Sequence, residues 1–206
     1  AEYGGAGGDF GHCAVLIEEI AYANVSGLGF PLHSDIIAPY IYRLGSDEQK
    51  RRWLPKAAAG EVVLAIAMSE PGAGSDLKAV RTTAKRDGDH WILNGEKTWI
   101  TNGSIADIAV VWARAEEGVM GFLVERGTPG FSTSDIHGKL SMRASVTSSL
   151  HFSDCRVPDS ARLPNGTEPA CAEKPAMKHT PIDYDTVREM LRTATPDRVL
   201  RFIGKS

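Results

Sequence analysis

The sequence is poor in cysteine and lacks both a long apolar run and an excess of charge of one sign. Its three cysteines, Cys13, Cys155 and Cys171, lie far apart, which fits neither a disulfide framework nor a zinc-ligand spacing. No run approaches the roughly 18 apolar residues that a membrane-spanning helix needs, and no signal-peptide pattern opens the chain. The formal net charge of -3 provides no basic surface for nucleic acid. These absences predict a chain of a reducing compartment, with no nucleic-acid partner and no membrane span.

The composition is that of a globular protein. Apolar residues make up 42% of the 206 positions and charged residues 24%, so extensive disorder is not expected. The six histidines are scattered, without the paired spacing of metal ligands. We therefore predict one or two small domains and no metal site.

The first sixty residues have a helical pattern. Apolar residues recur at helical spacing after Asp9, which can cap the segment. A second apolar stretch covers 36–44, where Pro39 predicts a late start or a kink. Ser46 and Gln49 then fit a capping box for a third helix that ends near residue 59.

Residues 61–158 change to a strand pattern. Short apolar runs alternate with turn signals such as Asp87-Gly88 and Asn94-Gly95, and a roughly 8–12-residue spacing of this kind is typical of an antiparallel sandwich or barrel. Alternation of strands with helices is missing, which argues against a doubly wound parallel sheet. The predicted fold class is α+β: antiparallel helices over 1–60 followed by an antiparallel β-barrel or sandwich domain over 61–158.

The composition changes again over residues 159–206. The stretch 159–181 is rich in Pro, Ala and polar residues and is predicted to be a linker. Beyond it, 185–193 and 196–202 are each compatible with a short helix, too short to be stable alone. The third segment is therefore predicted to be an irregular, partly helical tail.

One glycine-containing segment, 69–76, directly follows an apolar strand and has the sequence Ser-Glu-Pro-Gly-Ala-Gly-Ser-Asp. Its glycines permit close approach of the backbone to a ligand, and its N–H and hydroxyl groups suit phosphate or heterocycle oxygens. The alternative is an ordinary Pro-Gly turn.

A second segment covers residues 91–103. Asn94-Gly95 predicts a tight turn, after which Trp99 and Thr101 point to the same face of the next strand. An indole beside a hydroxyl suits a planar heteroaromatic ligand. The alternative is a core tryptophan beside a strand threonine.

Taken together, the two segments resemble the acyl-CoA dehydrogenase family. Further matches follow in order over residues 1 to about 163, among them Glu2-Tyr3-Gly4-Gly5, Gly45-Ser46-Asp47-Glu48-Gln49-Lys50, Pro129-Gly130-Phe131 and Arg143-Ala144-Ser145. Residues 164–206 resemble no part of that family. The resemblance implies a flavoenzyme with an N-terminal helical domain, a middle β-domain and a C-terminal helical bundle. Residues 1–60 would then be part of the first domain and 61–158 the second, with the bundle absent.

The resemblance also implies FAD as the cofactor. It assigns the FAD contacts to Ile66, Ala67, Met68, Ser69, Glu70, Pro71, Gly72, Ala73, Gly74, Ser75, Trp99, Ile100 and Thr101. Within this set Ser69 is implied to donate its hydroxyl to the pyrimidine side of the flavin, Thr101 to face N5, and Trp99 to pack beside the rings. Ser75 is implied to meet the acyl-CoA substrate as well.

The reaction implied by the resemblance is α,β-dehydrogenation of an acyl-CoA thioester. A glutamate removes the α-proton, the flavin takes the hydride, and the electrons pass to an electron-transferring flavoprotein. No residue of this chain matches the context of that glutamate, so we assign no catalytic residue and predict a truncated, inactive chain. Glu70 is interpreted as a structural hydrogen-bond acceptor rather than a base.

Two non-enzymatic alternatives remain: a flavin- or CoA-binding module, and a fragment without function. The family resemblance further implies a homo-oligomer in the mitochondrial matrix or the bacterial cytoplasm.

Overall fold

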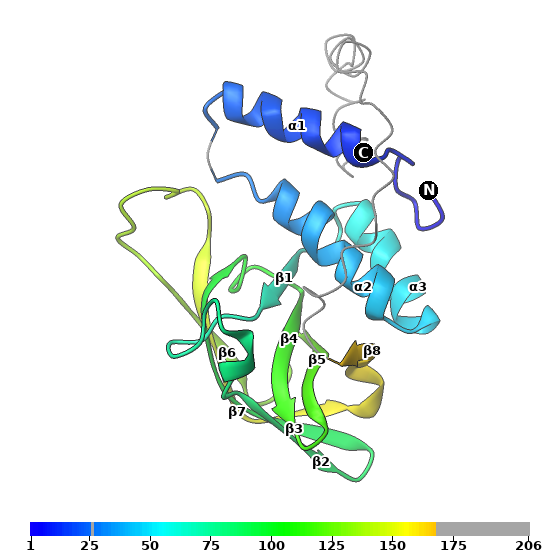
Figure 1. Cartoon of the computed structure of the whole chain (residues 1–206), viewed down its shortest axis with the longest axis vertical. Helices are drawn as coiled ribbons and strands as arrows, with labels where there is room; N and C mark the ends of the chain where they lie inside the picture. The colour runs from blue at the N-terminus through cyan, green and yellow to red at the C-terminus, as the bar shows by residue number, and fades with distance from the viewer. Residues whose placement is uncertain (26, 168–206) are drawn as a thin grey trace.

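The structure is a computed structural model that describes residues 1–25 and 27–167, a layer of helices over an eight-stranded sheet (Figure 1). The helical elements are α1 (Phe10–Tyr22), the π-helix η1 (Pro31–Ile37), α2 (Ala38–Leu44), α3 (Asp47–Ala58) and the 3-10 turns η2 (Leu77–Ala79) and η3 (Asp159–Ala161). The strands are β1 (Leu64–Ala67), β2 (Thr83–Asp87), β3 (His90–Thr101), β4 (Ile108–Ala115), β5 (Gly118–Glu125), β6 (Phe131–Asp135), β7 (Thr147–Pro158) and β8 (Arg162–Thr167).

The predicted starts of the first and third helices are confirmed. The Asp9 carboxylate accepts hydrogen bonds from the first-turn N–H groups of α1, and Ser46 forms a capping box with Gln49 at the start of α3. The second helix begins earlier than predicted, at Pro31, and its hydrogen-bonding pattern changes from π to α beside Pro39. Because proline has no N–H to donate, it interrupts the regular α pattern at this point. None of the helices described for 1–25 and 27–167 is long and apolar enough to cross a membrane.

The sheet is open and mainly antiparallel. Its strand order is β6-β7-β3-β2-β4-β5-β8, and β1 pairs with β4 outside this path. The β1–β4 and β2–β4 pairs are parallel, and the other pairs are antiparallel. The predicted α+β class is confirmed, but the sheet does not close into a barrel.

Strand β8 lies where the sequence predicts a linker. Arg162–Thr167 pairs with β5 at the edge of the sheet, and the side chain of Leu163 is fully buried. The Gln49 amide of α3 donates to the carbonyls of Ser160 and Arg162, which fixes the chain at the start of the strand. Pro164 is tolerated because an edge strand has one unpaired side. The two further helices predicted at 185–193 and 196–202 lie outside the described residues.

The sheet has an apolar core on each face. On one face, residues of α2 and α3 such as Ile41 and Trp53 pack with Val110 and Trp112 of β4. On the other face, the alternate residues of β4 and β5 pack against β3 and β7, and the Trp91 and Phe122 rings lie 5.4 Å apart. Helices α2 and α3 therefore cover one face of the sheet, which lies below them in Figure 1.

Candidate functional site

The structure brings together the two segments that the sequence singles out. The turn over residues 68–76 follows β1, and its Ser69 carbonyl accepts a hydrogen bond of 3.0 Å from the N–H of Thr98 in β3. The Lys97 ammonium reaches the same turn, 3.1 Å from the Met68 carbonyl oxygen. Ser69, Trp99 and Thr101 consequently belong to one local region rather than to two separate turns.

The turn is closed around Glu70. Its N–H donates to the Ala73 carbonyl and its carbonyl accepts from the Ala73 N–H, at 2.8 and 3.1 Å. Its carboxylate accepts the N–H groups of Arg81 and Thr82 at 2.7 and 2.9 Å. The interpretation of Glu70 as a structural acceptor is therefore confirmed.

Glu70 and Lys97 form a buried ion pair. The Lys97 Nζ lies 2.8 Å from Glu70 Oε1, and the two side chains are 0% and 5% exposed. Burial by itself raises the pKa of Glu70, but the hydrogen bonds from Lys97, Thr82 and the backbone together hold it below its usual value. Burial lowers the pKa of Lys97, and Glu70 offsets only part of that effect.

Lys97 is not among the site residues predicted from the sequence, although the pattern of β3 contains a signal for it. Lys97 shares the inward face of β3 with Trp91 and Leu93, both buried. A lysine at an inward position of an apolar strand requires a buried partner. The alternation of inward and outward residues along β3 therefore predicts an ion pair for Lys97.

Strand β3 is irregular between Lys97 and Ile100, where its register against β7 shifts. Trp99 lies in this bulge with a φ of 59°, in the left-handed region. Lys97 and Ile100 both face the interior, so the bulge reverses the alternation and leaves Trp99 63% exposed. The alternative of a core tryptophan is thereby wrong.

The predicted FAD contacts differ in what they offer a ligand. The side chains of Ala67, Glu70, Ala73 and Ile100 are buried in the protein, so these residues present only backbone atoms. The side chains of Ile66 and Met68 are half-buried against the helix-side core. The exposed or half-buried remainder consists of Ser69, Pro71, Gly72, Gly74, Ser75, Trp99 and Thr101.

This remainder fits a large planar heteroaromatic cofactor such as a flavin. Trp99 offers an exposed indole, and the half-buried hydroxyls of Ser69 and Thr101 have no hydrogen-bond partner within 1–25 and 27–167. An added Cβ at Gly72 or Gly74 would meet nothing within 4 Å, so the turn backbone is open to close approach. Across the described residues, no three His, Cys, Asp or Glu side chains gather as metal ligands.

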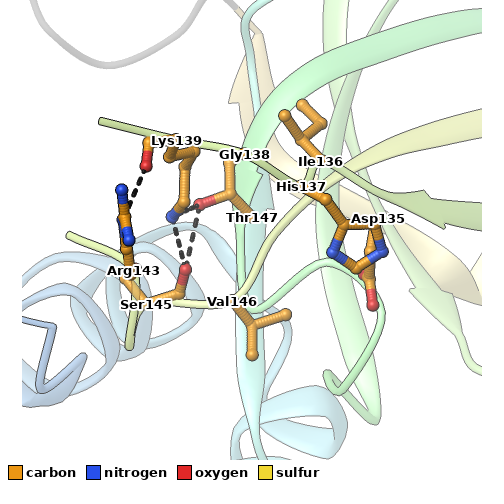
Figure 2. Close-up of a pocket in the computed structure, with 9 residues that line it drawn as sticks. All are labelled: Asp135, Ile136, His137, Gly138, Lys139, Arg143, Ser145, Val146 and Thr147. Carbon is orange, nitrogen blue, oxygen red and sulfur yellow. Dashed lines mark hydrogen bonds between the residues drawn. The ribbon is translucent and has the colours of Figure 1, made fainter. Parts of the chain in front are cut away.

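A cavity of about 400 Å³ lies in the loop between β6 and β7 (Figure 2). It contains none of the predicted site residues, but Thr147 in its wall pairs with Thr101 across the sheet. The Lys139 ammonium donates to the carbonyls of Met142 and Ser145 and to the Thr147 hydroxyl. Since an ammonium has three protons, Lys139 holds the loop together and has none left for a ligand.

The fold and the site define an α+β protein with a candidate site for a planar cofactor at one end of its sheet. The chain belongs to the acyl-CoA dehydrogenase family. Residues 1–61 match the acyl-CoA dehydrogenase N-terminal domain, and residues 65–155 match the acyl-CoA dehydrogenase middle domain.

Curated relatives are dehydrogenases. The chain is 48% identical over 168 residues to the mitochondrial long-chain specific acyl-CoA dehydrogenase of Sus scrofa, covering 78% of this chain and 39% of that protein. It is 44% identical over 165 residues to the mitochondrial isovaleryl-CoA dehydrogenase of Pongo abelii, covering 76% and 39%. The chain thus spans about two fifths of the length of these relatives.

Solved structures of dehydrogenases have a fold similar to that of this chain. An acyl-CoA dehydrogenase from Geobacillus kaustophilus has a TM-score of 0.74 at 42% identity, covering 80% of this chain and 45% of that chain. A glutaryl-CoA dehydrogenase from Mycobacterium smegmatis, in complex with FADH2, has a TM-score of 0.65 at 50% identity, covering 66% and 35%.

Proposed function

We propose that this chain binds FAD and supplies the flavin site of an acyl-CoA dehydrogenase. The observation that carries the proposal is the exposed Trp99, turned outward by the bulge beside the unpartnered hydroxyls of Ser69 and Thr101 in the described part of the chain. Family membership and a relative solved with FADH2 support the identity of the cofactor.

The chain's own residues would take distinct roles. Trp99 covers part of the ring system, the Ser69 hydroxyl donates to its pyrimidine side, and the Thr101 hydroxyl faces N5. The open backbone at Gly72 and Gly74 permits close contact. The exposed Ser75 meets the acyl-CoA substrate. When bound, FAD supplies an acceptor for the hydride removed from the acyl chain.

For the whole protein we propose α,β-dehydrogenation of an acyl-CoA thioester, with electrons passing to an electron-transferring flavoprotein. A solved structure at 41% identity bears the name of such a flavoprotein and covers 63% of this chain. Residues 1–60 and 61–158 would be the helical and middle domains of a homo-oligomer in the mitochondrial matrix or the bacterial cytoplasm. Mitochondrial and bacterial relatives support both locations.

We also infer that these 206 residues alone do not turn over acyl-CoA. Glu70 is engaged by Lys97 and two backbone N–H groups, so it is not free to remove a proton from a substrate. No other residue matches the context of the family's catalytic glutamate. Without a base within hydrogen-bond reach of the α-carbon, proton transfer loses about 10²–10⁴-fold.

A titration with FAD tests the proposal. We expect the purified chain to bind FAD, and Trp99→Ala and Thr101→Val each to weaken binding, the latter by about 0.5–1.5 kcal/mol for one lost hydrogen bond. Tyr22→Ala removes an aromatic ring that is 74% exposed, and Thr133→Val removes an exposed strand hydroxyl; both serve as matched controls. Equal affinity in the site variants and the controls contradicts the assigned roles.

Activity is tested with the FAD-loaded chain and acyl-CoA of several chain lengths under anaerobic conditions. We expect no bleaching of the flavin absorbance. Flavin binding without bleaching would also be the result for a non-catalytic binding module. Bleaching with enoyl-CoA formation would instead reveal a base within the chain.

A further inference from the structure

Glu70 and Lys97 are the two charged residues that are buried in the described part of the chain. In every other ion pair described for 1–25 and 27–167, at least one side chain is 41% exposed or more. A buried ion pair is a poor source of stability, because desolvation of both charges offsets most of their attraction. Its place in the fold therefore needs another explanation.

The pair joins the two segments of the candidate site. Lys97 Nζ contacts both the Met68 carbonyl and the Glu70 carboxylate, at 3.1 and 2.8 Å. The adjacent residues, Thr98 and Ser69, form the backbone hydrogen bond between β3 and the turn. The ammonium thus lies at the point where the two segments meet.

The pair also holds one end of the bulge. Lys97 is the last inward-facing residue before the register shift, and Trp99 follows two positions later with its positive φ. At the other end, Ile100 is buried in the core and the Asn102 N–H donates to the Val146 carbonyl. With both ends fixed, the backbone of the bulge that carries Trp99 is held relative to Ser69.

We propose that the Glu70–Lys97 pair is a positioning device that fixes the spacing between Ser69 on the turn and Trp99 and Thr101 on the bulge. This inference rests on the proposed FAD function, for which these residues are the contacts. Neither Glu70 nor Lys97 touches the cofactor with its side chain, since both side chains are buried.

The test uses Lys97→Met in the full chain. We expect FAD binding to weaken about 10–100-fold, the range found when a group that orients metal ligands is removed, and the visible circular dichroism of the bound flavin to change. The matched control is Arg52→Met, which breaks an exposed ion pair of the same 2.8 Å length to Glu125. It should leave both properties unchanged. A Lys97→Met chain with wild-type affinity and dichroism overturns the inference.

A second variant separates positioning from stability. Lys97→Met alone leaves a buried carboxylate without its counter-charge, whereas Glu70→Gln combined with Lys97→Met removes both charges. We expect the thermal midpoint of the double variant to recover toward wild type while its FAD affinity and dichroism stay altered. Recovery of all three together would mean a merely structural role and would overturn the inference.

Hydrogen exchange separates this inference from the proposed function. In the FAD-free chain, Lys97→Met should speed exchange of the Thr98 amide, which donates to Ser69, and Arg52→Met should not. If the wild-type chain binds no FAD, the proposed function fails. The exchange rate then decides alone whether the pair fixes the spacing: unchanged exchange overturns the inference, and faster exchange supports it.

Discussion

Trp99 combines a strained backbone with an exposed side chain. A bulky residue at positive φ costs of order 1–3 kcal/mol, and an indole that is 63% exposed gains little burial in return. Strain of this kind persists where the surrounding structure imposes it, and such positions cluster at ligand sites. The conformation of Trp99 is therefore consistent with a contact that exists only when a ligand is bound.

A pair of substitutions at this position measures the strain. Both Trp99→Gly and Trp99→Ala remove the indole, but only glycine adopts a φ of 59° without a Cβ penalty. We expect Trp99→Gly to exceed Trp99→Ala in free energy of unfolding by about 1 kcal/mol, and both to bind FAD weakly. Urea denaturation measures the difference. An alanine variant as stable as the glycine variant would show that the bulge relaxes once the indole is gone.

Glu70 makes the stability of the chain sensitive to acid. Although burial opposes ionisation, its hydrogen bonds hold the pKa in the folded state below the ordinary value of 4.5. A carboxyl group with a lowered folded-state pKa stabilises the fold above its unfolded-state pKa, and this contribution is lost as the pH falls through the folded-state value. We expect the free energy of unfolding to fall below about pH 4.5, and Glu70→Gln to flatten that part of the profile. Urea denaturation at a series of pH values provides the profile.

The matched control for this profile is Glu125→Gln, which removes a carboxylate whose ion pair with Arg52 is exposed. It should leave most of the acid dependence in place, because exposed pairs contribute little to stability. An acid profile that is the same in the Glu70 and Glu125 variants would assign the effect to other carboxylates.

At the scale of elements, the sequence predicts those features that depend on a single helix or strand. The capping residues Asp9 and Ser46 mark the starts of α1 and α3. The tight turn predicted at Asn94-Gly95 is wrong. The latter two residues lie within one long strand rather than between two strands, because β7 carries the opposing bulge at Asp154 with a φ of 47°. Alternation alone could not show this, since it depends on the partner strand.

The candidate site could be predicted from the sequence only in part, because some of its features depend on a partner strand. The motifs identify Ser69, Trp99 and Thr101 as a set, and the structure brings them together. The outward turn of Trp99 depends on a register shift against β7, which no local pattern reveals. The partner of Lys97 likewise lies 27 positions away in the sequence.

Strand β8 shows most clearly what local sequence patterns cannot predict. Its composition, with Pro164 and Asn165-Gly166, is that of a loop, yet Leu163 fills a site in the core shared by the helices and the sheet. Tertiary burial overrides the local propensity here.

Leu163→Ala tests whether β8 is part of the core. We expect a loss of about 2–5 kcal/mol in the free energy of unfolding, as for other fully buried leucines. Leu140→Ala, at a position that is 96% exposed, is the control and should change stability by less than about 0.5 kcal/mol. Thermal or urea denaturation compares the two. Similar stability in both variants would mean that residues 162–167 are a loosely attached linker and not part of the core.

At the scale of the whole molecule, the helices and the sheet share a core. The cluster on the outer face of the sheet contains Ile41 and Trp53 from the helices together with Leu64, Val110 and Leu123 from the strands. By contrast, among the side chains described for α1, at residues 11–22, only Val15 is a fully buried apolar side chain. The helical layer therefore has little core of its own, although its sequence matches a separate family domain.

This sharing predicts that the helices depend on the sheet for their stability. Residues 1–60 expressed alone should lack stable helical structure, because isolated helices shorter than about 12–15 residues are marginal in water and α3, for example, has 12. In the full chain, far-ultraviolet circular dichroism and tryptophan fluorescence should report the same urea midpoint, since Trp53 lies in the helices and Trp112 in the sheet. Helix α1 should exchange its amide protons faster than α2 and α3, because it buries the least. A cooperative thermal transition of residues 1–60 alone would contradict the dependence and show two units that fold separately.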